Sequence, residues 1–223
     1  MVFALNSLYY DGDSFSCLLP AGQYKTTAHC IAEKLGFDLD HYGFVGKNHD
    51  KILRTAMRYS FDHSQSLMLI GVGVTQRLEV HVEDVDKFVY PYKYFHEEHC
   101  VRPLQGKDVE QFADLLEWQY VQTTTLFDIV LLHDYLEHKS INFLIHNLGF
   151  DFYKDDEYNF ANGIENQVRA RPKLLNFYEN SLHSLMKDAN IKPWDYDEYG
   201  WNGHPDEQGH AMYADYLMEH INV

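Results

Sequence analysis

The segment Ser66–Val72 constrains the fold of this chain more than any other stretch of the sequence. Its centre, Leu67 to Ile70, is continuously apolar, so an extended strand here would need apolar cover on both of its faces. Such a strand is typical of the middle of a parallel sheet that carries helices on each side. The sequence therefore predicts a buried central strand at this position.

Strand-like and helix-like segments alternate along the rest of the chain. Further short strands are predicted at residues 7–11, 37–42 and 141–146, and helices at residues 23–35, 48–59, 108–138, 172–187 and 206–221. This order predicts an α/β fold, a three-layer α/β/α sandwich around a mainly parallel sheet. We expect one domain over residues 1–223, with irregular insertions near 75–105 and 147–170.

Local signals set several of these boundaries. Gly36 follows an apolar helical pattern and is a typical C-terminal stop. The helix at 48–59 is expected to turn inward the apolar residues Ile52, Leu53, Ala56 and Met57. The helix at 108–138 is either continuous or broken near residues 123–125, and Pro172 suits the first turn of the helix at 172–187.

Charge and cysteine usage exclude several classes of partner. The net charge is −16 with neutral histidines, so a nucleic acid or an anionic membrane surface would be repelled. The three cysteines, Cys17, Cys30 and Cys100, form no disulfide framework, and Cys17 and Cys30 are expected to be small buried apolar residues rather than nucleophiles. Residues 1–10 lack the pattern of a signal peptide, which leads to the expectation of a cytoplasmic protein.

Polar and glycine-rich loops follow the first two predicted strands. Gly12 permits a sharp turn, and Ser14 then lies where a hydroxyl can face a cleft beside backbone N–H groups. Gly46 precedes a helix and its bare N–H could donate to a developing oxyanion. Each loop taken alone is also compatible with an ordinary turn.

Two later loops carry further candidates. Thr75 or Gln76 follows the central strand and could add a donor to an oxyanion site. His204 stands before Pro205, which fixes the chain direction at the start of the last helix. A histidine held in such a loop can act as a general base toward a serine at another strand end.

Together and in this order, the four loops resemble the SGNH/GDSL hydrolase family, which has an SGNH/flavodoxin-like sandwich. The resemblance implies that Ser14 in Gly12-Asp13-Ser14 is the nucleophile and His204 the base. It also implies an oxyanion hole built from the Ser14 and Gly46 N–H groups and from Thr75. The sequences of residues 46–52 and 204–210 look like those of family members encoded in tailed-phage genomes. This resemblance adds a virion-associated location as an expectation.

The chain departs from the family pattern at two places. The Gly-x-Asn block is Gly73-Val74-Thr75, so a shorter hydroxyl replaces the amide. Trp201 occupies the position of the acid that orients the histidine. Asn202, Asp197, a neighbouring acid at 195 or 198, or a backbone carbonyl is left to orient the ring; otherwise the site is a Ser-His dyad.

No metal or cofactor is expected. His96, His99 and Cys100 offer ligand atoms, but their spacing differs from that of the zinc motif His-Glu-x-x-His. The segment Gly71-x-Gly73 lacks the third glycine of a dinucleotide-binding fingerprint.

The expected function is a serine esterase that acts on a small-molecule or carbohydrate ester, such as a sugar O-acetyl group. The alternatives are a binding or structural module of a phage that retains the fold, and a transferase that uses the same acyl-enzyme. The sequence leaves the oligomeric state open.

Overall fold

A parallel sheet forms the centre of the computed structural model, which describes residues 5–12, 25–43, 49–60, 65–73, 78–82, 85–89, 118–148, 159–178, 180–191 and 204–221. In this part of the chain the sheet has five strands in the order β2-β1-β3-β6-β7, and all neighbouring pairs are parallel. Their bounds are Ser7–Asp11 (β1), Asp38–His41 (β2), Ser66–Val72 (β3), Asn142–Asn147 (β6) and Leu174–Leu175 (β7). The predicted central strand is confirmed, because every residue of β3 is buried.

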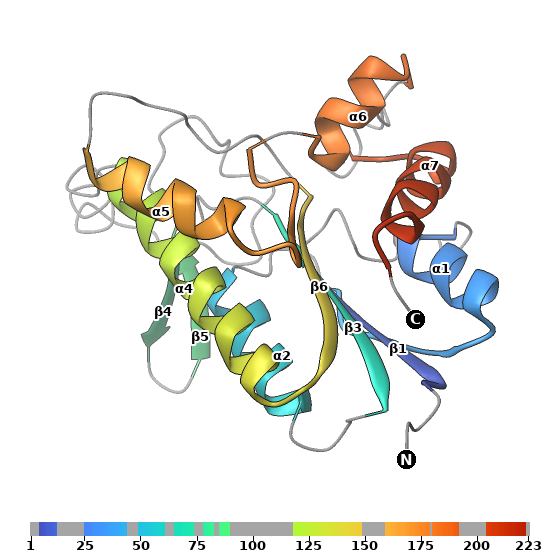
Figure 1. Ribbon diagram of the computed structural model, residues 1–223, viewed down its shortest axis with the longest axis horizontal. Coiled ribbons are helices and arrows are strands. Elements are labelled where there is room, and N and C mark those ends of the chain that lie inside the picture. Colours follow the sequence, from blue (N-terminus) through green and yellow to red (C-terminus); the bar gives the residue numbers. More distant parts are fainter. Residues whose placement is uncertain are drawn as a thin grey trace.

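Helices cover both faces of this sheet (Figure 1). One face carries α1 (Thr27–Leu35), α6 (Leu182–Asp188) and α7 (Glu207–Met218). The other carries α2 (His49–Ser60), α4 (Trp118–His138) and α5 (Asn159–Arg169). The predicted three-layer α/β/α architecture is therefore confirmed for the described residues.

Alternation along β1 divides its side chains between the two helical layers. Tyr9 packs in the apolar cluster beneath α2 and α4, whereas Leu8 and Tyr10 pack in the cluster beneath α1 and α7. The same rule sends successive residues of β3 to opposite faces. This division fixes the face of the sheet on which each side chain within the strands lies.

The helix boundaries have clear local causes. Gly36 adopts a left-handed conformation with φ 68° and its N–H bonds the last carbonyls of α1, as its sequence position predicts. Asp206 caps α7, where its carboxylate accepts a hydrogen bond of 2.7 Å from the Gly209 N–H. Of the apolar residues expected to face inward from α2, Met57 is the exception, since it is 38% exposed.

Three expectations about the connections are wrong. A hairpin of β4 (Leu78–Val82) and β5 (Val85–Val89), which pair antiparallel, lies within the first predicted irregular insertion, and the alternation of apolar and polar residues along β4 favours a strand. In the second, α5 replaces the expected loop, because Ile164 and Val168 lie four residues apart and are both buried. The single helix expected at 172–187 is instead β7 followed by α6, since left-handed Asn176 and Asn180 interrupt the helical pattern.

α4 runs without a break through the threonines at 123–125. Of the two alternatives for that segment, a continuous helix is therefore correct in the described part.

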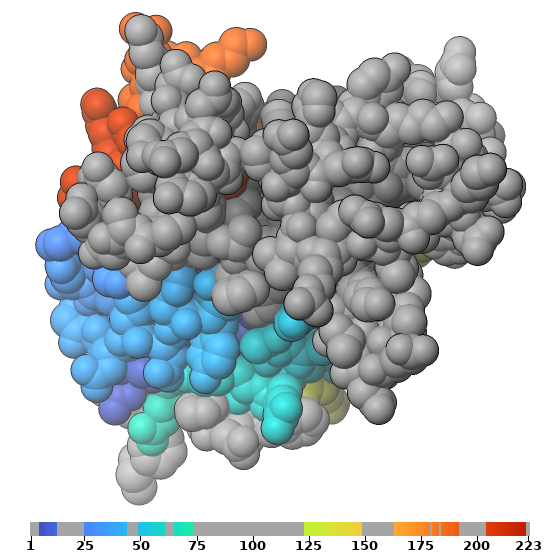
Figure 2. Space-filling model, turned by 180° about the vertical axis from the view of Figure 1, so that it is seen from behind, coloured from blue at the N-terminus to red at the C-terminus, as the bar shows by residue number. Residues whose placement is uncertain are grey.

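β2 forms an edge of the sheet and its residues are partly exposed. The view from behind shows the blue surface of α1 and β2 and the cyan surface of α2 on this side (Figure 2). No helix among the described residues has the length and apolar character to cross a membrane.

Candidate active site

The strand order has its topological switch point between β1 and β3. The chain leaves β1 toward β2 on one side and returns to β3 on the other, and ligands of such sheets bind where the order reverses in this way. β1 leads through Gly12 toward Ser14, and β3 leads through Gly73 toward Thr75. Both candidates therefore follow strands that end side by side at the same edge of the sheet.

Several predicted site residues lie outside the part of the chain that the structure describes. These are Ser14, Gly46, Thr75, Asp197 and Asn202, together with the discounted cluster at residues 96–100. The nearest described residues in the sequence are Gly12, Gly43, Gly73 and His204. Their roles therefore stay predictions.

His204 is partly buried and lies directly before the buried Pro205 and the capping Asp206. The start of α7 is held against the start of α1, because the Thr27 hydroxyl lies 3.0 Å from Nδ1 of His210 and donates to the His210 carbonyl at 3.3 Å. α1 is the helix that follows the loop of Ser14. This contact places the start of α7, which directly follows the predicted base, beside the start of α1.

A group of imidazoles lies around this contact. Burial, helped by the charges of His204, His41 and His29, lowers the pKa of His210 to about 3. The His41 ring stacks on Tyr10 at 5.8 Å and lies 5.9 Å from His29, whose Nδ1 is 2.9 Å from the Thr26 hydroxyl. Neutral His210 is thus a structural residue, while partly buried His204 stays the candidate base in this group.

Sequence reasoning missed a second buried histidine. His146 lies at the end of β6, is fully buried, and its Nδ1 is 3.0 Å from the Tyr213 hydroxyl. That hydroxyl donates to the Asn147 carbonyl at 2.8 Å, so it accepts from the His146 Nδ1–H. Burial lowers the pKa of His146 to about 3, which keeps this ring neutral beneath the site. Only the pairing of β6 with β3 and the packing of α7 bring these groups together.

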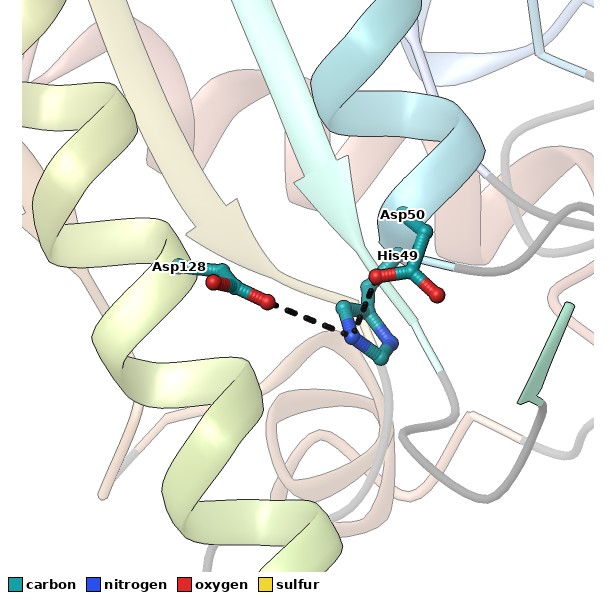
Figure 3. A group of neighbouring side chains, drawn as sticks. All are labelled: His49, Asp50 and Asp128. Atoms are coloured by element: carbon teal, nitrogen blue, oxygen red, sulfur yellow. Dashed lines mark ion pairs between the residues drawn. The ribbon is translucent and has the colours of Figure 1, made fainter.

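One group of side chains in the described residues has the composition of a metal site (Figure 3). Nε2 of the buried His49 lies 3.1 Å from Oδ1 of Asp50 and 3.9 Å from Oδ2 of Asp128. Burial raises the pKa of Asp128, an effect that His49 opposes and Asp50 adds to. Metal-bound histidines usually donate their second N–H to an acceptor, but Nδ1 of His49 is buried without a hydrogen-bond partner in the described part. The group therefore fits a polar contact that joins the start of α2 to α4.

The cysteine prediction is tested at Cys30 alone among the three. Its thiol is free and the residue is only partly buried, on the side of α1 that packs against the apolar cluster beneath α1 and α7. Burial, together with the charge of Glu33, raises the pKa of this thiol. A raised pKa disfavours the nucleophilic thiolate, which agrees with the prediction that Cys30 has no catalytic role.

Comparison with known proteins bears on the fold. No family model and no curated protein sequence matches the chain. The structure is similar to that of a G-D-S-L family protein from Desulfitobacterium hafniense DCB-2, with a TM-score of 0.55 and 10% identity over 97% of this chain and 99% of that one. It is also similar to a catalytic mutant of Axe2, an acetylxylan esterase from Geobacillus stearothermophilus, with a TM-score of 0.52 and 11% identity over 100% of this chain and 97% of that one.

A third similar structure is the acetyl xylan esterase AlAXEase, with a TM-score of 0.53 and 13% identity over 97% of this chain and 100% of that one. At these identities the likeness shows the fold. The chain has the α/β fold of GDSL-type esterases, and the resemblance predicted from its loops is confirmed at this level.

Proposed function

We propose that this chain is a single-domain serine esterase that removes an acyl group, such as an O-acetyl group, from a small molecule or a carbohydrate. One observation carries the proposal: β1 and β3 end side by side in a sheet whose fold is that of GDSL-type esterases, and α1, the helix that follows β1, holds the start of α7. The matches extend over nearly all of both chains, which supports a single domain over residues 1–223.

In the proposed reaction, the Ser14 hydroxyl attacks the ester carbonyl carbon while His204 takes its proton. The resulting oxyanion accepts hydrogen bonds from the N–H groups of Ser14 and Gly46 and from the Thr75 hydroxyl. The intermediate then collapses, and His204 returns the proton to the departing alcohol. Water then attacks the acyl-enzyme carbonyl while His204 takes its proton. Collapse of this second intermediate breaks the bond to the Ser14 oxygen and releases the carboxylic acid, and His204 returns the proton to Ser14.

The orienting group for His204 is the least usual part of the proposed site. Trp201 stands where related loops carry an acid, so Asn202 or Asp197 is proposed to accept from the imidazole N–H. Loss of the acid in a catalytic triad costs about 10⁴-fold in turnover. We therefore expect an enzyme whose turnover depends on how well a neutral or displaced group orients the ring.

A carbohydrate ester is the favoured substrate class for two reasons. Two of the similar structures are described as acetylxylan esterases, and their substrate is extended to this chain as part of the proposal. The net charge of −16 disfavours polyanionic substrates over neutral ones.

The proposal is tested by hydrolysis of p-nitrophenyl acetate and of acetylated xylo-oligosaccharides. Wild type should turn over, while Ser14→Ala and His204→Ala should fall to the background rate. His138→Ala is the matched control, because His138 is an exposed histidine at the end of α4. A fluorophosphonate probe should label wild type at Ser14 and fail to label Ser14→Ala.

The absence of an acid at Trp201 also favours a second candidate function. This candidate is a binding or structural module that retains the fold, for example in a phage particle. That candidate predicts equal background rates for wild type and both variants and no labelling of Ser14. Binding of unmodified xylo-oligosaccharides by such an inactive chain would then favour the module over the enzyme.

A further inference from the structure

A buried carboxylate lies where β1 ends and the predicted nucleophile loop begins. Asp11 is the last residue of β1 and has no exposed surface. One of its oxygens accepts from the Tyr9 hydroxyl at 2.6 Å, and the other accepts from the Gly12 N–H at 2.7 Å. Such short bonds to a charged acceptor are stronger than ordinary neutral hydrogen bonds.

Asp11 lies on the face of β1 that α2 and α4 cover. Tyr9 packs beneath α2 and α4, and its hydroxyl reaches Asp11 on the same face of the strand. His204 precedes α7, which covers the opposite face. The bonds from Tyr9 and Gly12 indicate a structural role for Asp11 at the point where the chain leaves β1.

The neighbours of Tyr9 make it a firm support for this carboxylate. Its ring is fully buried and lies 4.2 Å from the Tyr59 ring and 5.1 Å from the Tyr42 ring. Burial and the nearby Asp11 charge raise the pKa of Tyr9 far above its usual value, so the phenol keeps its proton and donates. The hydrogen-bonded chain thus runs from the packed core through Asp11 to the backbone of Gly12.

We propose that Asp11, held by Tyr9, is a positioning residue that fixes the Gly12 peptide and so sets the place of the nucleophile loop. This inference rests on the proposed function, since Ser14 lies two residues beyond Gly12. A displacement of about 1 Å in a reacting group can lower the rate about 100-fold. Asp11 thus affects the attack by Ser14, whereas other residues bind the substrate.

The chain offers a matched control for the phenol. The Tyr59 hydroxyl donates to Oδ2 of Asp40 at 2.6 Å, the same length as the Tyr9 bond, but Asp40 belongs to the neighbouring strand β2. Tyr9→Phe and Tyr59→Phe each delete one such bond and leave the ring in place. Asp11→Leu removes both bonds to the carboxylate, while Asp11→Asn keeps an oxygen that can accept from Gly12.

The first measurement is kinetic. We expect Tyr9→Phe to lower kcat and the rate of fluorophosphonate labelling about tenfold, and Asp11→Leu about 100-fold, with KM within a factor of about two. Asp11→Asn should recover most of the loss, and Tyr59→Phe should keep the wild-type kcat. Thermal unfolding of each variant shows the fraction that is folded, so that rates refer to folded protein.

The second measurement needs no activity. The Gly12 amide, observed by NMR on protein labelled with ¹⁵N-glycine, should exchange with solvent much faster in Asp11→Leu than in wild type or in Tyr59→Phe. If wild type neither reacts nor labels at Ser14, the proposed function fails, and the exchange result still decides whether Asp11 anchors Gly12. Wild-type kcat, labelling and exchange in folded Asp11→Leu and Tyr9→Phe would overturn the positioning role.

Discussion

The Thr27 hydroxyl lies 3.0 Å from Nδ1 of His210, and this contact joins the first described helix to the last across 183 residues of chain. Both residues are almost completely buried. In the sequence α1 follows the predicted nucleophile loop and α7 follows the predicted base, so we expect the contact to affect the proposed reaction as well as stability. Variants at this contact can therefore show whether a loss of stability and a loss of esterase turnover occur together.

Thr27→Val should lower the free energy of unfolding by about 1–3 kcal/mol, because it leaves the His210 ring without its buried partner at nearly constant volume. Urea unfolding measures this change. Thr55→Val is the control, since the Thr55 hydroxyl only donates to the Lys51 carbonyl within α2. We expect esterase turnover of folded Thr27→Val to fall severalfold; equal stability losses in the two variants would contradict the role assigned to the contact.

Stability should decrease as the pH is lowered from about 6.5 toward 5, before most carboxylates titrate. Burial lowers the pKa of His146 and of His210 to about 3, so the unfolded chain binds protons at these residues in this range and the folded chain does not. Each histidine contributes at most about 1.4 kcal/mol per pH unit to the slope.

Urea unfolding at several pH values measures that slope. His146→Phe should reduce the slope, because it removes one of the two buried rings. His220→Gln should leave it unchanged, because His220 is exposed at the end of α7. A wild-type stability that stays flat from pH 6.5 to 5 would show that neither buried ring is held neutral.

Two glycines should respond in opposite ways to alanine. A Cβ at Gly71 would overlap the Leu148 side chain and lie 3.2 Å from Cε1 of His146, whereas Gly163 in α5 has open space at that position. Gly71→Ala should destabilise the protein by about 1–3 kcal/mol through overpacking. Gly163→Ala should stabilise it by up to about 1 kcal/mol through helix propensity. Thermal and urea unfolding of the pair test this, and equal effects would contradict the close packing of β3 against the residue that follows β6.

Introducing the missing acid at position 201 should raise the turnover of the proposed esterase. Trp201→Asp places a carboxylate three residues before His204, where the resemblance implies the orienting group. Loss of such an acid costs about 10⁴-fold in a known triad, so even partial restoration should raise kcat by about tenfold or more. The comparison set is Asp197→Asn and Asn202→Ala. If Trp201→Asp gains nothing while one of these loses most of the activity, that residue already orients the imidazole.

Local sequence determined a large part of this fold. The continuous apolar run of β3, the period of α1 and α2, and the stop at Gly36 are set by residues close in the chain, and each was found where predicted. The cap at Asp206 also has a local cause, because its carboxylate accepts from an N–H three residues away. Interactions of such short range need no knowledge of the remaining chain.

Tertiary structure decided what local patterns could not. The break between β7 and α6 depends on asparagines that adopt left-handed conformations, which their neighbours in sequence did not reveal. The burial of His146 against Tyr213, and of Asp11 on the face that α2 and α4 cover, follows from strand pairing and helix docking over long sequence separations. The sequence thus indicated which residues could do chemistry, whereas only the packed sheet determined which face each side chain occupies, because that depends on pairing with distant strands.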